Sequence, residues 1–254
     1  MRRIKPVAHD DELTVVDHLD ELRARLMVSL AAFLVAFALT AWQSDLVLDI
    51  VNAPLPDGRE PITLGPAEPF IQTLKNAGYA AILLTLPVLL FQAYAFLAPA
   101  LGPRERRMAF PLLLMVPLLF VAGVVFCYLL VLPPALDFLL SFNESQFNNQ
   151  LRASDYYDFA TLTMLAMGLG FQVPVGVLVL TRLGVVSYDK LRRSRRYAIV
   201  GIAVLAALLP TLDPVTLVLE MLPLMALYEL SIQLSWLVEP GKWARENVSS
   251  EPAG

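Results

Sequence analysis

Two carboxylates lie among arginines close to the ends of apolar runs. Glu21 belongs to the polar segment 14–25, four residues before Arg25, and Glu105 is surrounded by arginines in the segment 96–107. A carboxylate binds a guanidinium through two parallel hydrogen bonds, and this geometry selects arginine over lysine. Two carboxylates held at one surface are therefore suited to reading two adjacent arginines. Spacing alone favours simpler interpretations, namely an i,i+4 pair of Glu21 with Arg25 and local charge compensation by Glu105.

A second group of polar side chains interrupts the apolar runs themselves. Glu220 and Glu229 lie in the last run, and Gln172 and Gln92 lie in two earlier ones. Ionisable groups inside a bilayer are costly and are candidates for function. An amide in the same setting often only joins two helices, at about 1 kcal/mol. For Gln172 this second interpretation is slightly favoured.

Several classes of site are excluded by the residues that the chain lacks. The histidines are His9 and His18, both before the first apolar run, and Cys127 is the single cysteine. No intramembrane nucleophile–base pair is available, and HExxH, Walker A and GxGxxG motifs are missing. A single cysteine allows no intramolecular disulfide. We therefore expect no enzyme, no metal and no cofactor.

Membrane-spanning helices must position these residues. The chain is 57% hydrophobic and 17% charged, with a mean hydropathy of +0.62, whereas soluble domains are about one quarter charged. Helices satisfy every backbone polar group within the bilayer, and the alternation of barrel strands is absent. The prediction is an all-α integral membrane protein with a single membrane domain, 1–254, and a mobile tail, 240–254. The six predicted spans are about 26–42, 77–96, 109–132, 157–183, 197–209 and 215–237.

Lysine and arginine are distributed unevenly between the connections. Sixteen lie in the N-terminal segment, the second and fourth connections and the C-terminal tail, whereas Arg59, Lys75 and Arg152 occupy the remaining connections. Cytoplasmic connections carry the excess of positive charge, so both termini are predicted to be cytoplasmic. The long connections 43–76 and 133–156 then lie outside. Acidic residues before the first run argue against a cleavable signal peptide.

The fifth and sixth runs depart from an ordinary span. The run 197–209 has 13 residues, which is about 20 Å of helix against about 30 Å of hydrocarbon. Pro210 follows it, and Glu220, Pro223 and Glu229 interrupt the sixth run. Such a pair thins the bilayer or admits water, unless the ends have been drawn too tightly. Prolines within other runs favour kinked helices and a curved bundle.

Several motifs in combination resemble the TatC family of protein translocase subunits. The segment 18–25, HLDELRAR, resembles the family's opening signature HLxELRxR, and 67–70, AEPF, resembles its short outer-loop segment. The segment 87–101, together with 105–107, resembles its long second-span motif, and 171–174, FQVP, resembles its fourth span. The opening and second-span motifs are specific in combination. Six spans in the predicted orientation agree with the resemblance independently.

The resemblance implies both a fold and a function. TatC-like proteins form a cupped bundle of six helices, with short fifth and sixth helices, and bind the twin-arginine motif of signal peptides at the cytoplasmic face. The carboxylates assigned to that task correspond to Glu21 and Glu105, with Phe96, Leu22 and Arg23 beside them. The resemblance reverses the preference stated above and makes these two carboxylates the expected receptor groups.

The resemblance also implies partners and a location. TatB-like and TatA-like single-span proteins are expected to dock around the fifth and sixth helices, and the chain is expected to form homo-oligomers within the complex. The expected location is the bacterial or archaeal cytoplasmic membrane. The proton-motive force drives the export of folded proteins, no nucleotide is hydrolysed and no nucleic acid is bound.

The likeness extends over roughly residues 16–236 and includes the first outer loop. There, Pro54, Glu68, Pro69 and Phe70 are expected to have structural roles. These four positions complete the set of residues that the resemblance singles out on the outer side.

This chain departs from the family pattern at two places. Gln172 stands where many relatives carry Glu, which places in doubt a mechanism that needs an ionised carboxylate there. Asp213 matches the acid between the fifth and sixth spans, but 214–217 replaces the Ser-Gln pair that follows it in some relatives. The polar contact with a partner would then depend on Thr216 or Glu220, or be absent.

A small-molecule secondary transporter is the alternative. It would use Gln172, Glu220 and Glu229 as a site at the middle of the membrane. Transporters of this kind are commonly built from two related halves with broken helices at corresponding positions. The sequence shows no such paired halves.

Overall fold

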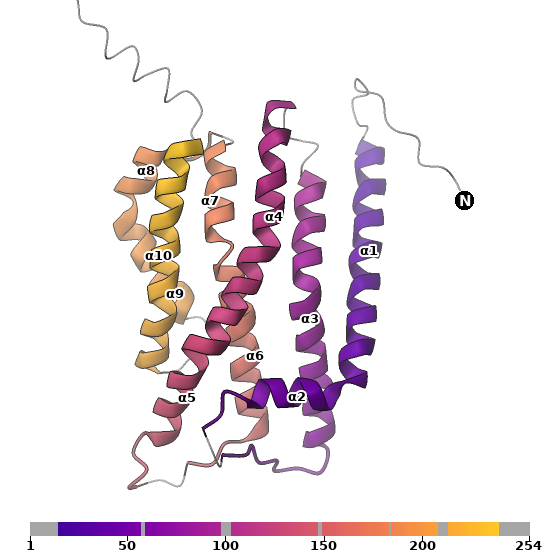
Figure 1. Cartoon of the computed structure of the whole chain (residues 1–254), viewed down its shortest axis with the longest axis vertical. Coiled ribbons are helices and arrows are strands. Elements are labelled where there is room, and N and C mark those ends of the chain that lie inside the picture. The colour runs from indigo at the N-terminus through magenta and orange to yellow at the C-terminus, as the bar shows by residue number, and fades with distance from the viewer. Residues whose placement is uncertain are drawn as a thin grey trace, which may run out of the picture.

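The computed structural model describes residues 15–56, 59–97, 103–146, 149–182, 184–207 and 213–238. Within these ranges, the side chains are described for all residues except 15–17, 94, 97 and 103–113. Helices make up most of the described chain, and Figure 1 shows most of the long ones standing roughly side by side, with the short α2 lying across one end. Their bounds are α1 Val15–Trp42, α2 Ser44–Asn52, α3 Glu68–Leu97, α4 Pro103–Phe126, α5 Leu132–Ser141, α6 Ala153–Gly170, α7 Val173–Arg182, α8 Tyr188–Arg193, α9 Arg195–Ala207 and α10 Pro214–Val238.

Five stretches of the described chain are long and apolar enough to cross a membrane. They are His18–Trp42, Glu68–Ala93, Leu114–Ser141, Ala153–Arg182 and Pro214–Trp236. The fifth predicted span falls on α9, whose 13 residues give a helix of about 20 Å. The expectation of a short fifth helix is therefore confirmed by the length of α9.

The third span is longer than the predicted run 109–132. After α4, a π-helical turn over Cys127–Val131 leads directly into α5, which ends at Ser141. Two prolines, Pro133 and Pro134, follow directly after the predicted end of the run. They lie in the first turn of α5, where a missing N–H breaks no helical hydrogen bond, and the helix can continue.

The fourth predicted run, 157–183, is divided into two helices. α6 ends at Gly170 and α7 begins at Val173, and the N–H of Gln172 turns back to the carbonyl of Leu169 at 2.9 Å. Pro174 explains the break, because it has no N–H to donate and disfavours helical geometry in the residue before it.

The expectation of a short sixth helix is wrong. α10 continues through Pro223 for 25 residues. Neither glutamate in this helix needs to face lipid, because Glu220 is completely buried within the bundle and Glu229 accepts a hydrogen bond from Arg195 at 2.7 Å. The helix can therefore contain both glutamates without ending.

The core lies where α5, α6, α10 and the π-helical turn meet. Tyr156 in the first turn of α6 is 1% exposed, and its hydroxyl donates to the carbonyl of Val51 in α2. At the other side of the bundle, α1 packs on α3, and the Thr40 hydroxyl donates to the Ala77 carbonyl at 2.8 Å. The first of these hydrogen bonds attaches α2 to α6, and the second attaches α1 to α3.

Two glycines allow α4 and α6 to approach closely. A Cβ atom at Gly123 would lie 2.8 Å from the carbonyl oxygen of Met167, and one at Gly168 would lie 2.6 Å from the ring of Phe120. Larger residues at either position would force the helices apart, as expected for small residues at a helix crossing in a membrane.

We expect Gly123→Ala to destabilise the protein by about 1–3 kcal/mol, because the new methyl group meets backbone atoms that cannot move aside. Gly176→Ala in α7 is the matched control, since a Cβ there meets nothing within 4 Å. Thermal unfolding in detergent compares the two variants. Equal stability of both would show that the α4–α6 crossing tolerates a side chain.

Candidate functional site

An arginine of α1 is shared between a carboxylate of the same helix and an amide of α3. Arg25 donates from Nε and Nη2 to Oε1 of Glu21, at 3.0 and 2.6 Å. Its Nη1 donates to Oε1 of Gln92 in α3 at 3.0 Å. About a quarter of each charged side chain, 25% for Arg25 and 27% for Glu21, remains exposed. The i,i+4 pair predicted from spacing is therefore present, and it also links two helices.

An aromatic pair adjoins this polar group. The rings of His18 and Phe96 are stacked, with centroids 4.2 Å apart and planes inclined by 15°. His18 Nδ1 lies 4.0 Å from Oε2 of Glu21. The structure thus brings Phe96 and Glu21 together, with His18 between them. We refer to His18, Glu21, Arg25, Gln92 and Phe96 as the inner cluster.

The remaining residues predicted to bind signal peptides are placed less completely. Leu22 is 44% exposed and Arg23 is also exposed, so both side chains are accessible beside the inner cluster. Glu105 lies on the first turns of α4, but its side chain is outside the described residues. The prediction that Glu21 and Glu105 act as a pair therefore stays a prediction.

Gln172 lies at the break between α6 and α7 and joins α6 to α4. Its Nε2 donates to the carbonyl of Val116 at 3.2 Å and approaches the carbonyl of Gly168 at 3.5 Å. The main-chain N–H of Gln172 has already turned to Leu169, so the side chain supplies the donor that the Gly168 carbonyl would otherwise lose. Gln172 therefore links α4 to α6 through side-chain hydrogen bonds, as in the interpretation that it joins two helices.

The polar residues at the start of α10 lie inside the molecule. Asp213 is 6% exposed, and its Oδ1 accepts from the N–H of Thr216 at 2.8 Å, which is the bond of a helix N-cap. The side chains of Thr216 and Glu220 are completely buried. A partner helix could reach them only if α10 moved, and the predicted partner contact at these positions remains a prediction.

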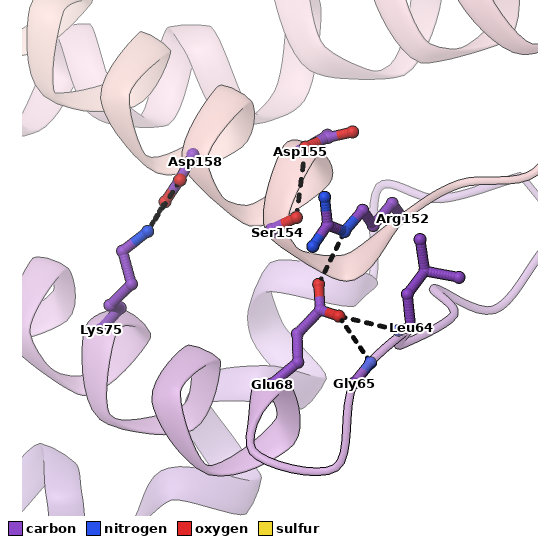
Figure 2. Close-up of polar contacts among 8 residues, drawn as sticks. All are labelled: Leu64, Gly65, Glu68, Lys75, Arg152, Ser154, Asp155 and Asp158. Carbon is purple, nitrogen blue, oxygen red and sulfur yellow. Dashed lines mark hydrogen bonds and ion pairs between the residues drawn. The ribbon is translucent and has the colours of Figure 1, made fainter.

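Glu68 organises the opposite end of the molecule. Figure 2 shows its carboxylate between the loop before α3 and the start of α6. Oε2 accepts from the N–H groups of Leu64 and Gly65, at 2.7 and 3.3 Å, and Oε1 accepts from Nε of Arg152 at 2.9 Å. Ile62 also forms a parallel β-bridge with Arg152. This arrangement supports a structural role for Glu68.

The other predicted outer-loop residues differ in their surroundings. Pro54 lies in the turn that follows α2, and Pro69 occupies the first turn of α3, where proline is tolerated. Phe70 is 72% exposed. Its ring therefore has little contact with the described part of the chain, and a packing role within this chain has no support.

The three cations assigned to the outer side each have a carboxylate partner. Lys75 Nζ lies 2.8 and 2.7 Å from the two oxygens of Asp158, as Figure 2 shows. Arg152 pairs with Glu68, and Arg59 pairs with Glu144 at 2.5 Å. Together these pairs attach α3 and its preceding loop to α6 and to the loop that follows α5.

Sequence reasoning missed some of these partners. The contact of Arg25 with Gln92 and the stacking of His18 on Phe96 join residues that are far apart in the chain, so no local spacing indicates them. For Arg152 the sequence did contain a signal. A cation in a connection with few lysines and arginines indicates a specific partner, which the structure shows to be Glu68. Within the described ranges, no group of three or more His, Cys, Asp or Glu side chains is placed to hold a metal ion.

Comparison with known proteins decides the family. The family described as "Sec-independent protein translocase protein (TatC)" matches residues 17–223, which is most of the chain. This chain belongs to the TatC family. The sequence-based resemblance and the all-α membrane fold are thereby confirmed, and the secondary-transporter alternative receives no support.

Relatives of this TatC-family chain come from chloroplasts and bacteria. The chloroplastic Sec-independent protein translocase protein TATC of Pisum sativum is 38% identical over 236 residues, 91% of this chain and 65% of that protein. The TatC proteins of Deinococcus radiodurans and Escherichia coli K12 are 35% and 33% identical over 86% and 89% of this chain, and 84% and 89% of their own lengths. A crystal structure of a twin-arginine translocase receptor, TatC, is 37% identical, with a TM-score of 0.75, over 87% of this chain and 99% of that one.

Charge reversal tests whether Lys75 and Asp158 hold the N-terminal parts of α3 and α6 together. We expect Asp158→Lys alone to lower stability, because it places two cations side by side, and Lys75→Asp combined with Asp158→Lys to restore much of the loss. The coupling energy should be about 0.5–1 kcal/mol, since both side chains are more than one third exposed. Thermal unfolding of the single and double variants measures it. A double variant no more stable than the singles would contradict the pairing.

Proposed function

We propose that this chain is the receptor subunit of a twin-arginine translocase and binds twin-arginine signal peptides at the cytoplasmic surface. Membership of the TatC family supports the system, and the inner cluster supports the site. The single observation that carries the site is the Glu21 carboxylate, which lies partly exposed and already receives two N–H groups from a guanidinium. It therefore has the chemistry and the access that an incoming arginine needs.

The neighbouring residues have complementary roles in this proposal. Glu105 supplies the second carboxylate, and Phe96 provides an apolar surface beside the first one. Leu22 and Arg23 are exposed on the same helical segment as Glu21 and flank the bound peptide. The peptide thus meets one charged and one apolar contact within a short distance, which favours arginine followed by hydrophobic residues.

The same proposal fixes an orientation. α1 begins and α10 ends at the upper end of the molecule in Figure 1, which is also where α8 carries Lys190, Arg192 and Arg193. Because the cytoplasmic side of a membrane protein carries the excess of lysine and arginine, this end is proposed to be cytoplasmic. Glu68 and its hydrogen-bond partners Leu64, Gly65 and Arg152 then lie on the outer side.

Partners and energy source follow from the family. We infer docking of TatA-like and TatB-like single-span proteins around α9 and α10, homo-oligomerisation within the complex, and export of folded proteins driven by the proton-motive force in a bacterial or archaeal cytoplasmic membrane. Val200, Val204 and Leu205 support α9 as a contact, because each is more than half exposed on this short helix. The buried Thr216 and Glu220 are less suitable contacts.

Binding of labelled signal peptides to the purified protein in nanodiscs tests the receptor proposal. We expect wild type to bind an Arg-Arg peptide at least about tenfold more tightly than its Lys-Lys counterpart, a difference of about 1.4 kcal/mol, because lysine lacks the fork that fits a carboxylate. Glu21→Gln and Glu105→Gln should each remove most of this preference.

Glu144→Gln is the matched control for these variants, since Glu144 is an exposed carboxylate at the opposite end of the molecule. It should leave peptide binding unchanged. Equal affinity of wild type for the two peptides would contradict the receptor proposal, and full preference in both inner variants would contradict the assignment of the carboxylates.

The orientation is open to a separate test by cysteine labelling. Cys127 is completely buried, so the natural cysteine should not react with a membrane-impermeant maleimide. In intact cells we expect Glu60→Cys to be labelled from outside and Arg192→Cys to be labelled only after the membrane is opened, because both positions are exposed but lie at opposite ends. The reverse pattern would overturn the proposed topology.

A further inference from the structure

Arg25 offers Glu21 the same chemistry that a signal arginine would offer. Two of its N–H groups, on Nε and Nη2, converge on Oε1 of Glu21, and a third, on Nη1, is held by Gln92. The proposed receptor carboxylate is therefore already bound to a guanidinium in the protein without peptide. Any ligand that needs this carboxylate meets an occupant that belongs to the chain itself.

We propose that Arg25 is an internal competitor that occupies Glu21 in the empty receptor and must leave before a signal arginine can bind. Arg25 would then set the affinity of the receptor for its peptides. This inference rests on the receptor function proposed above and adds to it a residue that limits binding. It also assigns Gln92 as the group that retains Arg25 when Glu21 releases it.

Exchange is favoured over sharing because of the charge and surroundings of the carboxylate. Glu21 and Arg25 together carry no net charge, so an arriving cation gains little Coulomb attraction while the pair is intact. The second oxygen of Glu21, Oε2, lies 4.0 Å from the His18 ring, which is stacked on Phe96. The groups on that side are therefore an imidazole and an aromatic ring, which add no negative charge to attract a second guanidinium.

The Gln92 contact makes the exchange less costly. An arginine released from a carboxylate inside a partly buried site would lose its charged partner and leave N–H groups unpaired. The Gln92 amide oxygen, 3.0 Å from Nη1 of Arg25, remains as an acceptor after release. Arg25 is one quarter exposed, so its other N–H groups can turn to water.

Competition of this kind has a specific thermodynamic consequence. If the ligand binds only receptors in which Glu21 is free, the apparent affinity is the intrinsic affinity reduced by the fraction of free receptors. That fraction is a property of the empty protein. Removal of the competitor should therefore tighten every ligand of Glu21 by the same factor and leave the preference between ligands unchanged.

Arg25→Gln and Arg25→Lys separate competition from other roles in the nanodisc assay with Arg-Arg and Lys-Lys peptides. We expect Arg25→Gln to tighten both peptides by a similar factor of about three to ten, the range for a partly exposed, doubly bonded ion pair. Arg25→Lys keeps the charge but loses the fork and the Gln92 contact, so it should tighten both peptides by a smaller factor. Thermal unfolding checks that the variants are folded. If Arg25→Gln does not fold, the peptide affinities of Arg25→Lys alone test the proposal.

Each other result overturns the inference in a distinguishable way. Weaker or unchanged binding in Arg25→Gln would mean that Arg25 positions Glu21 or does nothing for binding. Wild-type affinity in Arg25→Lys combined with tightening in Arg25→Gln would mean a general charge effect. If wild type shows no Arg-Arg preference, or Glu21→Gln binds as wild type does, the receptor assignment itself fails, whatever the Arg25 variants do.

Discussion

The cost of an unpaired polar group in hydrocarbon governs this structure. Lipid offers no hydrogen bonds, so helices satisfy the backbone internally. Several buried hydroxyls bond back to their own helix, as Thr85 does to Ala81 and Thr181 does to Val177. Where a helix breaks, a side chain must replace the missing donor. Gln172 does this between α6 and α7, which is why the break can exist inside the membrane.

The same constraint makes the two ends of the molecule different. At the end that carries Glu68, three cations are each joined to a carboxylate of another segment, and the loops are attached by these pairs. At the end that carries the inner cluster, the pair of Glu21 and Arg25 lies within one helix and remains partly exposed. A pair within one helix can open without unfolding a loop. The contacts of Glu21 and Arg25 therefore allow a ligand to exchange without breaking the attachment of a loop.

The sequence predicted the elements that follow from local patterns. Hydropathy located the spans, the short α9 could be read from its 13 residues, and family motifs singled out Glu21 and Phe96, two members of the inner cluster. The errors arose where position within a helix decides the effect of a residue. The predicted third span ended just before Pro133, which lies in a tolerated first turn of α5. Glu220 was taken as an interruption of the sixth run but is buried within the bundle. The contact of Arg25 with Gln92 depends on tertiary packing, and no spacing encodes it.

Gln172 shows how a departure from the family pattern can be consistent with the fold. Its Nε2 donates to the carbonyl of Val116, and a carboxylate at the same place could donate only if it were protonated. The Gln172 amide therefore donates this hydrogen bond without any change of protonation. In this chain the position is a neutral link between α4 and α6, because the Gln172 amide carries no charge. The ionisable groups that the proposed binding step uses are instead Glu21 in α1 and Glu105 in α4.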